Sequence, residues 1–323
     1  MAKNFNVSII VATYNPKLEK VKSTLFSAIN QKNITFEIIV TDDGSAVDYF
    51  DEIEAFFKRN KFYNYKLIKN KTNIGTVKNF YNALKKAKGE YVFATSPGDL
   101  LYDENTLVDL YDFAQNKNVE ICFGDAVYYS NDKNNLQILK QYNNAPLKSE
   151  IFDEDKSLIF QKIGFFSGNG ILGASFFRKK EAAIKYIGAI ENVCKYVEDN
   201  TSTAFALANN VRIYHLKRYV VWYEYGTGVS TSKNLEWKNL LKKDFDESFK
   251  KLYESYPNDL IIKNVYYKNK IHNKLFKAMY LFLTNPKFLI NVVKIKCIKK
   301  SIGPLHVFNE DILKKYIKIG SEN

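Results

Sequence analysis

The sequence predicts an α/β protein with a doubly wound, mostly parallel sheet and a C-terminal helical extension. Two observations support this: apolar strand-like runs alternate with helix-like segments over residues 7–129, and several apolar runs end in polar clusters. Alternating strands and helices build a parallel sheet with helices on both faces. The 323 residues and the hydrophobic content of 46% allow one large domain plus an accessory segment.

The predicted elements follow in a regular order. Residues 7–15 and 37–45 each run an apolar strand into a polar turn, and further strands are expected over residues 65–68, 90–95 and 119–129. Helices are expected over residues 17–31, 48–60, 76–88 and 105–116. Pro16 suits the first turn of the first helix, where the N–H that proline lacks has no helical partner anyway.

The pattern changes after this region. Residues 130–162 are rich in Asn, Asp, Lys and Gln, which predicts a loop or a short β excursion. Residues 164–173 then hold four glycines and two phenylalanines. This stretch is either a wall where the backbone closely approaches a ligand or a glycine-rich turn between two strands.

Polar residues gather where the predicted strands end. Tyr14 and Asn15 follow the first strand, Asp42 and Asp43 follow the second, and Asp99 comes shortly after the strand at 90–95. The carboxyl ends of parallel strands line the ligand crevice of an open α/β sheet. Such acids also commonly cap helices and turns, and a tyrosine at a strand end is commonly a packing residue.

These motifs in this order resemble family 2 glycosyltransferases of the GT-A fold, which transfer a sugar from a nucleotide diphosphate donor. The resemblance rests on Val-Ala-Thr-Tyr-Asn15, Asp42-Asp43-Gly-Ser45, Asn73-Ile-Gly75 and Glu198-Asp199, and it covers about residues 5–232. It implies a nucleotide-sugar half over about 1–130 and an acceptor half over about 131–232. Residues 233–323 form the basic helical extension.

The resemblance assigns the donor-binding residues. Tyr14 would stack on the base, backbone groups around Ala12 and Asn15 would face its edge, and Asp43, beside Asp42, would bind the imide N–H of uracil or guanine. Near Asn73, a helix N-terminus and Lys78 would favour the diphosphate. The family's usual Ala-Arg-Asn triplet lacks its arginine here, so a solvated Lys78 stays an equal alternative.

The expected divalent cation, Mg²⁺ or Mn²⁺, depends on a motif from which this chain departs. Related enzymes hold the metal with Asp-x-Asp, and the aligned residues here are Ser96, Pro97, Gly98 and Asp99. The usual direct ligand falls on Gly98, which leaves Asp99 as the protein contact. Cations bound to phosphates can manage with one or two carboxylates plus water. Alternatively, Asp99 accepts hydrogen bonds from the sugar or the ribose.

By the same resemblance, Asp199 is the catalytic base of an inverting transfer, with Glu198 binding substrate beside it. The alternative is that both acids merely complement a helix dipole. The Gly-Thr-Gly-Val-Ser run that ends at residue 230 is either a lid over the diphosphate or a surface loop.

Residues 260–309 hold ten lysines and no acid, so they carry ten of the thirteen net positive charges. Apolar residues at helical spacing accompany the lysines over residues 271–295, which predicts basic amphipathic helices. Two partners suit these helices equally: an anionic membrane surface, or a protein surface such as the catalytic domain or a second copy of the chain in a homodimer.

Other features set the expected context and the rival functions. Three dispersed cysteines, three isolated histidines and a start without a signal sequence predict a cytoplasmic protein. A peripheral place on the inner face of the membrane is the alternative that the basic helices allow. The expected acceptor is a glycan, a lipid-linked sugar or a glycoprotein in cell-surface polysaccharide or glycoconjugate synthesis. The rivals are a sugar nucleotidyltransferase and a basic nucleic-acid-binding module, although no nucleic-acid partner is expected.

Overall fold

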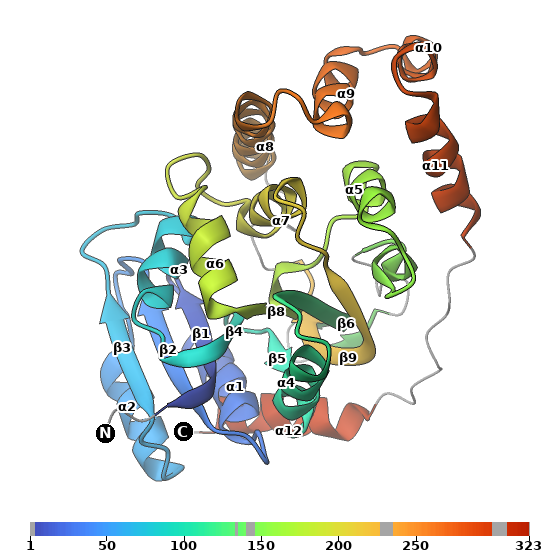
Figure 1. Ribbon diagram of the computed structural model, residues 1–323. Coiled ribbons are helices and arrows are strands. Elements are labelled where there is room, and N and C mark those ends of the chain that lie inside the picture. The colour runs from blue at the N-terminus through green and yellow to red at the C-terminus, as the bar shows by residue number, and fades with distance from the viewer. Residues whose placement is uncertain (1–3, 133–134, 140–145, 227–234, 299–308, 323) are drawn as a thin grey trace.

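The computed structural model describes residues 4–132, 135–139, 146–226, 235–298 and 309–322, shown as a ribbon in Figure 1. The strands are β1 (Phe5–Thr13), β2 (Phe36–Asp42), β3 (Tyr65–Lys69), β4 (Gly89–Thr95), β5 (Leu100–Leu101), β6 (Ile121–Asp132), β7 (Asn135–Ile138), β8 (Phe176–Lys179) and β9 (Tyr214–Glu224). The first helices are α1 (Leu18–Ile29), α2 (Phe50–Arg59), α3 (Thr76–Leu84) and α4 (Thr106–Asn116). The later helices are α5 (Leu158–Phe166), α6 (Lys180–Gly188), α7 (Glu198–Ala208), α8 (Leu235–Ser255), α9 (Leu260–Lys270), α10 (Lys274–Thr284), α11 (Pro286–Cys297) and α12 (Glu310–Ser321).

The strands form one sheet in the order β3-β2-β1-β4-β8-β6-β9-β5, with β7 paired to β6. β1 runs parallel to β2 and β4, β2 is parallel to β3, and β6 is parallel to β9. β5, β7 and β8 are antiparallel to their neighbours. The predicted fold class, an α/β protein with a mostly parallel sheet and C-terminal helices, is confirmed.

Helices cover both faces of the sheet because successive strand residues point to opposite sides. Ile10 and Ile39 pack into a core with residues of α3, α6 and α7. Ile9, Val11 and Ile38 pack into a second core with residues of α1, α2 and α4. All five side chains are fully buried, so the two layers fix the sheet and the positions of its strand ends.

Helix α5 replaces part of the predicted loop over residues 130–162 and part of the glycine-rich turn that follows it. Ser157 caps the helix by accepting the N–H of Phe160 at 3.3 Å. The prediction was wrong because Gln161 and Lys162, whose polarity suggested a loop, are buried. Gln161 exchanges two hydrogen bonds with the backbone of Ile213, at 2.9 and 3.0 Å. The strand β7 is the short β excursion that the sequence allowed.

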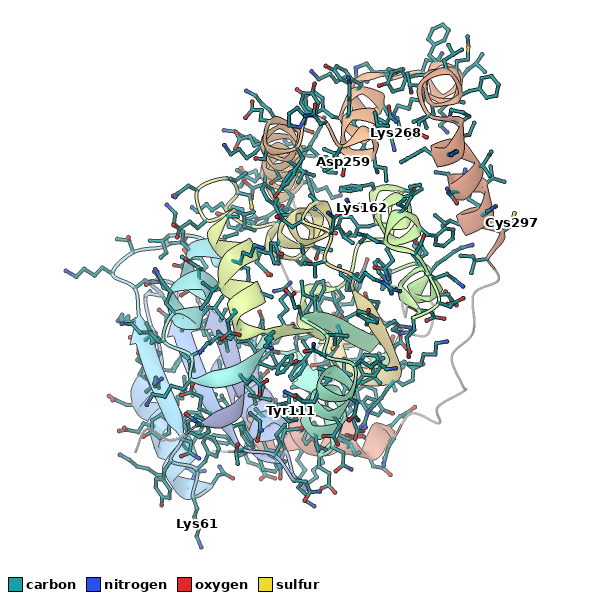
Figure 2. The ribbon with its side chains drawn as sticks, in the orientation of Figure 1. Lys61, Tyr111, Lys162, Asp259, Lys268 and Cys297 are labelled. Atoms are coloured by element: carbon teal, nitrogen blue, oxygen red, sulfur yellow. The ribbon has the colours of Figure 1, made fainter. Side chains whose placement is uncertain are left out.

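The C-terminal helices pack in two separate places. Helices α8 to α11 form an arc beside α5 and α7, and the ion pair between Lys162 and Asp259 joins α5 to the start of α9 at 3.1 Å (Figures 1 and 2). Helix α12 lies along α1, at the opposite end of the molecule from α10 (Figure 1). Gly320 permits this contact, because a Cβ there would meet Ser23 Oγ at 2.0 Å. Within the described ranges, no helix is both long and apolar enough to cross a bilayer.

Candidate active site

A cavity of about 510 Å³ opens at the carboxyl ends of β1 and β4, beside the first turn of α7. Its charged lining consists of four acids, Asp99, Glu198, Asp199 and Glu224, and no basic side chain of the described residues lines it. Ligands of open α/β sheets bind at this edge. A cavity whose charged lining residues are all acids suits a ligand that brings hydroxyl groups or cations.

The cavity unites some of the predicted residues and leaves others outside. The lining includes Ala12, Asp99, Glu198 and Asp199. The residues outside the lining are Tyr14, Asn15, Asp42, Asp43, Asn73 and Lys78. The predicted lid falls mostly on residues 227–232, which lie outside the described residues.

Two of the residues outside the cavity lining hold a turn. Asp42 is fully buried and accepts hydrogen bonds from the Ser45 N–H at 2.8 Å, from the Ser45 hydroxyl, and from Thr13 Oγ1 at 3.1 Å. Asn15 donates its N–H to Ser45 Oγ at 2.7 Å and accepts the N–H of Ala46 at 3.1 Å. The hydrogen bonds of these two side chains therefore connect the end of β1 to the turn that follows β2.

Asp43 binds the N-terminus of α3. Its carboxylate accepts the backbone N–H groups of Ile74 and Gly75, each at 2.9 Å, and the side-chain amide of Asn70 at 3.2 Å. The N–H of Val77 is bound as well, by the carbonyl of Lys195 at 3.2 Å. A carboxylate is favourable at a helix N-terminus. The N–H groups of Ile74, Gly75 and Val77 thus already have acceptors, and Asp43 is the anion that binds two of them.

The remaining donor candidates lie near this loop. Tyr14 is 51% exposed, so its ring is open to stacking. Lys78 is exposed on α3. The side-chain oxygen of Asn73 is buried and has no hydrogen-bond partner among the described residues.

Asp199 stands in the first turn of α7. Its Oδ1 accepts the backbone N–H of Asn200 at 2.7 Å and the side-chain amide of the same residue at 3.2 Å. Its Oδ2 lies 3.3 Å from the position of a Cβ on Gly173, so a larger residue there would crowd the carboxylate. Burial, followed by the negative charge of Glu198, raises the pKa of Asp199 to about 6. Asp199 is therefore ionised at neutral pH and binds a proton more readily than an ordinary aspartate.

Glu198 is paired with an arginine that the sequence analysis did not identify. Arg178 on β8 donates to Glu198 Oε1 at 2.5 Å, and both side chains are largely buried. The guanidinium also lies 4.2 Å from the ring centre of Phe176. This pair fixes the start of α7, next to Asp199.

Two further acids, Asp99 and Glu224, line the same cavity. Asp99 accepts the backbone N–H of Glu224 at 3.3 Å, and both residues are buried. Burial, and in addition the charge of Glu224, raises the pKa of Asp99 well above its usual range. Glu224 was missed, although an acid at the end of an apolar strand is the same signal that identified Asp43.

Helix α8 completes the cavity, although it lies beyond residue 232. Leu241 and Phe245 line the wall. Asp244 accepts the N–H groups of Lys195 and Tyr196, at 2.9 and 2.6 Å, and so holds the segment that leads into α7. The first helix of the basic extension is therefore part of the site.

Comparisons with known proteins agree with this arrangement. The sequence model of the family described as Glycosyl transferase family 2 matches residues 8–174. No curated protein gives a significant sequence match to the chain.

Among solved structures, the chain is similar to S. aureus TarS, with a TM-score of 0.55 and 20% identity over 98% of this chain. It spans 55% of that chain. The TarS 1-349 structure in complex with UDP-GlcNAc gives a TM-score of 0.56 at 20% identity and covers 98% of this chain and 90% of that one. The Pyrobaculum calidifontis mannosyltransferase PcManGT, in complex with GDP-Man and Mn²⁺, gives 0.57 at 15% identity, with 99% and 86% covered. At identities this low, the structural similarity establishes a shared fold and nothing more specific.

Proposed function

Because this chain belongs to glycosyl transferase family 2 and is a glycosyltransferase, we propose that it transfers a sugar from a nucleoside diphosphate donor with inversion at the anomeric carbon. The observation that carries this proposal is the position of Asp199, an ionised carboxylate with a pKa of about 6 in the wall of the cavity. A base with a pKa close to the working pH is the most effective proton acceptor.

The proposed reaction is one displacement. The carboxylate of Asp199 takes the proton of the acceptor hydroxyl, and the acceptor oxygen forms a bond to the anomeric carbon. On the opposite side, the bond from that carbon to the diphosphate oxygen breaks, and the electron pair leaves with the nucleoside diphosphate. Arg178 and Glu198 keep Asp199 in place during the transfer.

For the donor we favour a UDP-sugar, with GDP-sugars as the other class. The similar structures contain UDP-GlcNAc and GDP-Man, respectively. The base would lie against Tyr14 and the backbone near Ala12 and Asn15. Asp43 already accepts three hydrogen bonds, and a carboxylate offers about four acceptor positions, so one is left for the imide N–H of the base.

A divalent cation fits the donor side of the cavity. Asp99 is a buried oxygen ligand on the cavity wall, and hard cations need few protein carboxylates when phosphates and water supply the rest. No cluster of three or more ligating side chains occurs in the described part of the chain, so the proposed cation needs oxygen ligands from the substrate and water. When bound, it would neutralise charge on the leaving diphosphate.

The acceptor, we propose, is a glycan or a lipid-linked or protein-linked sugar of the cell surface, reached from an anionic membrane. Helices α10 and α11 support a membrane docking face, which we define by seven exposed large apolar residues: Leu275, Phe276, Met279, Phe282, Leu283, Ile290 and Val293. Exposed lysines at positions 274, 287, 294 and 296 accompany them. The inner face of α11 packs on the protein instead, through the buried Phe288 and Ile295. Basic helices with an apolar side suit anionic lipid.

Reversing the charge of Lys274 and Lys287 together should weaken binding to vesicles of phosphatidylserine and phosphatidylcholine at low salt. Each lysine near such a surface contributes about 1 kcal/mol, so the double glutamate variant should lose at least about 2 kcal/mol, roughly thirtyfold. Co-sedimentation at rising salt measures this. The matched control is Lys61→Glu with Lys86→Glu, two exposed lysines away from the docking face (Figure 2 labels Lys61). A wild-type chain that ignores vesicles but dimerises through α10 would show that a second copy covers this face.

The proposed activity is tested by incubating the full chain with a panel of UDP- and GDP-sugars and Mn²⁺ and measuring nucleoside diphosphate release. One donor should be turned over, slowly to water and faster once a suitable acceptor is added. EDTA should stop the reaction, and Asp199→Asn should serve as the inactive control. If no nucleotide sugar is turned over and none raises the melting temperature, the proposed donor class is wrong.

A further inference from the structure

Gly98 leaves the proposed metal site short of one carboxylate, and the fold brings another acid to the same place. Gly98 has a φ of +103°, a conformation that favours glycine. Its N–H donates to Thr24 Oγ1 at 3.0 Å, and its carbonyl accepts the hydroxyl of Tyr129 at 2.5 Å. The backbone at this position is thus held from both sides.

The space that a side chain at position 98 would enter is filled by Glu224. A Cβ built on Gly98 would lie 2.3 Å from Glu224 Oε2 and 3.3 Å from the carboxyl carbon. The separation of 2.3 Å is shorter than real Cβ contacts, so a side chain at position 98 would push the carboxylate of Glu224 out of its present place. The acid on β9 therefore lies where the side chain missing from position 98 would begin.

The bonding of Glu224 is incomplete. Its Oε2 accepts from Lys20 Nζ at 2.6 Å, but Oε1 is buried and has no hydrogen-bond partner among the described residues. Leaving a buried carboxylate oxygen unbound is unfavourable, and such atoms in native proteins commonly mark an ion or water. Glu224 lines the same cavity as Asp99, and Asp99 accepts the backbone N–H of Glu224, so the two residues are neighbours in the cavity wall.

We propose that Glu224 is the second carboxylate ligand of the donor-bound divalent cation and that it replaces the acid absent at Gly98. Oε1 would contact the metal, while Lys20 keeps Oε2 bound and orients the carboxylate, as outer partners of metal ligands do. Asp99, phosphate oxygens and water complete the coordination. This inference rests on the proposed function, because the nucleotide supplies the remaining ligands.

The first test measures Mn²⁺ affinity of the full chain by electron paramagnetic resonance of the free ion, with and without UDP. Wild-type protein should bind Mn²⁺ weakly alone and more tightly with UDP. Loss of an outer-sphere partner typically weakens metal binding about tenfold to hundredfold. Because Glu224 is proposed as a direct ligand, Glu224→Gln should weaken Mn²⁺ binding in the presence of UDP by at least that factor. Glu37→Gln is the matched control, because Glu37 is a buried glutamate paired with Lys66 at 3.1 Å and does not line the cavity. Equal affinity in Glu224→Gln and wild type would overturn the inference.

A second test needs no variant. Crystals of the wild-type chain grown with Mn²⁺ and UDP should show an anomalous peak within about 2.3 Å of a Glu224 oxygen. A metal bound by Asp99 and phosphate alone would refute the role of Glu224 while leaving the proposed function intact. If the wild type does not bind Mn²⁺ in the presence of UDP, both the role of Glu224 and the proposed use of a metal are wrong. Sugar transfer that persists in EDTA would then show that the proposed transferase activity is nevertheless correct.

Discussion

Replacing Asp199 by asparagine should lower the rate of sugar transfer by about 10²- to 10⁴-fold, because the amide keeps the shape but cannot accept the acceptor's proton. Nucleotide affinity should stay near the wild-type value, since Asp199 lies in α7 and the residues proposed to bind the base lie at the ends of β1 and β2. Single-turnover transfer and UDP calorimetry measure the two effects. A variant that retains most of its activity would show that another group takes the proton.

The effect of Asp199→Asn on stability distinguishes two roles for Asp199, a catalytic base and an acid that only stabilises the N-terminus of α7. Burial and Glu198 raise the pKa of Asp199 to about 6, so folding disfavours its charged form. The stability associated with this group is fully present below its unfolded pKa and is lost as the pH rises through about 6. Asp199→Asn should therefore melt at an equal or higher temperature than wild type at neutral pH, with the difference shrinking below pH 6. A clear loss of stability at neutral pH would indicate that the acid mainly complements the helix dipole.

The pH dependence of the rate follows from the same group. The base must be ionised, so kcat/KM should fall about tenfold for each pH unit below about 6 and level off above it. Glu198→Gln offers a comparison, because it removes the neighbouring charge that helps to raise the pKa of Asp199. The inflection of the rate profile should then move to lower pH.

The fold was predictable because its strands are nearly continuous apolar runs. Val7, Ile9 and Ile38 are fully buried, and such runs with helix-like segments between them have few alternatives to a parallel sheet. The error at residues 158–162 has a definite cause. Gln161 is polar in sequence but satisfies both of its groups on the backbone of Ile213, a contact across 52 residues that no local pattern contains.

The site was predictable only in part, for a related reason. Asp42, Asp43 and Asp99 all follow apolar strands, but only Asp99 reaches the cavity, because the other two bind nearby turns and loops. An acid at a strand end has the same local sequence in either role. Glu224 shows the converse, since its nearness to Asp99 spans 125 residues and depends on how β9 joins the sheet.

The largest stability effect should come from Asp43→Ala, which removes the anion at the N-terminus of α3. The N–H groups of Ile74 and Gly75 and the amide of Asn70 would lose their shared acceptor. Each buried donor left unpaired costs about 1 to 3 kcal/mol. Because water can bind some of the three freed donors, the free energy of unfolding should fall by about 2 to 4 kcal/mol in total. Urea titration followed by circular dichroism measures this.

Asp43→Ala should also weaken UDP binding, because the loop that it releases adjoins the donor side and the base loses its proposed acceptor, worth about 1.5 to 3 kcal/mol. Asn70→Ala is the matched control, since it removes the amide that donates to Asp43 and to Asn79 and leaves the carboxylate of Asp43 bound to Ile74 and Gly75. It should cost less stability and leave UDP affinity nearly unchanged. If Asp43→Ala destabilises the fold but binds UDP as tightly as Asn70→Ala does, Asp43 holds the loop and the base finds its acceptor elsewhere. If Asp43→Ala is as stable as wild type, the three hydrogen bonds of Asp43 do not stabilise the contact between α3 and the sheet.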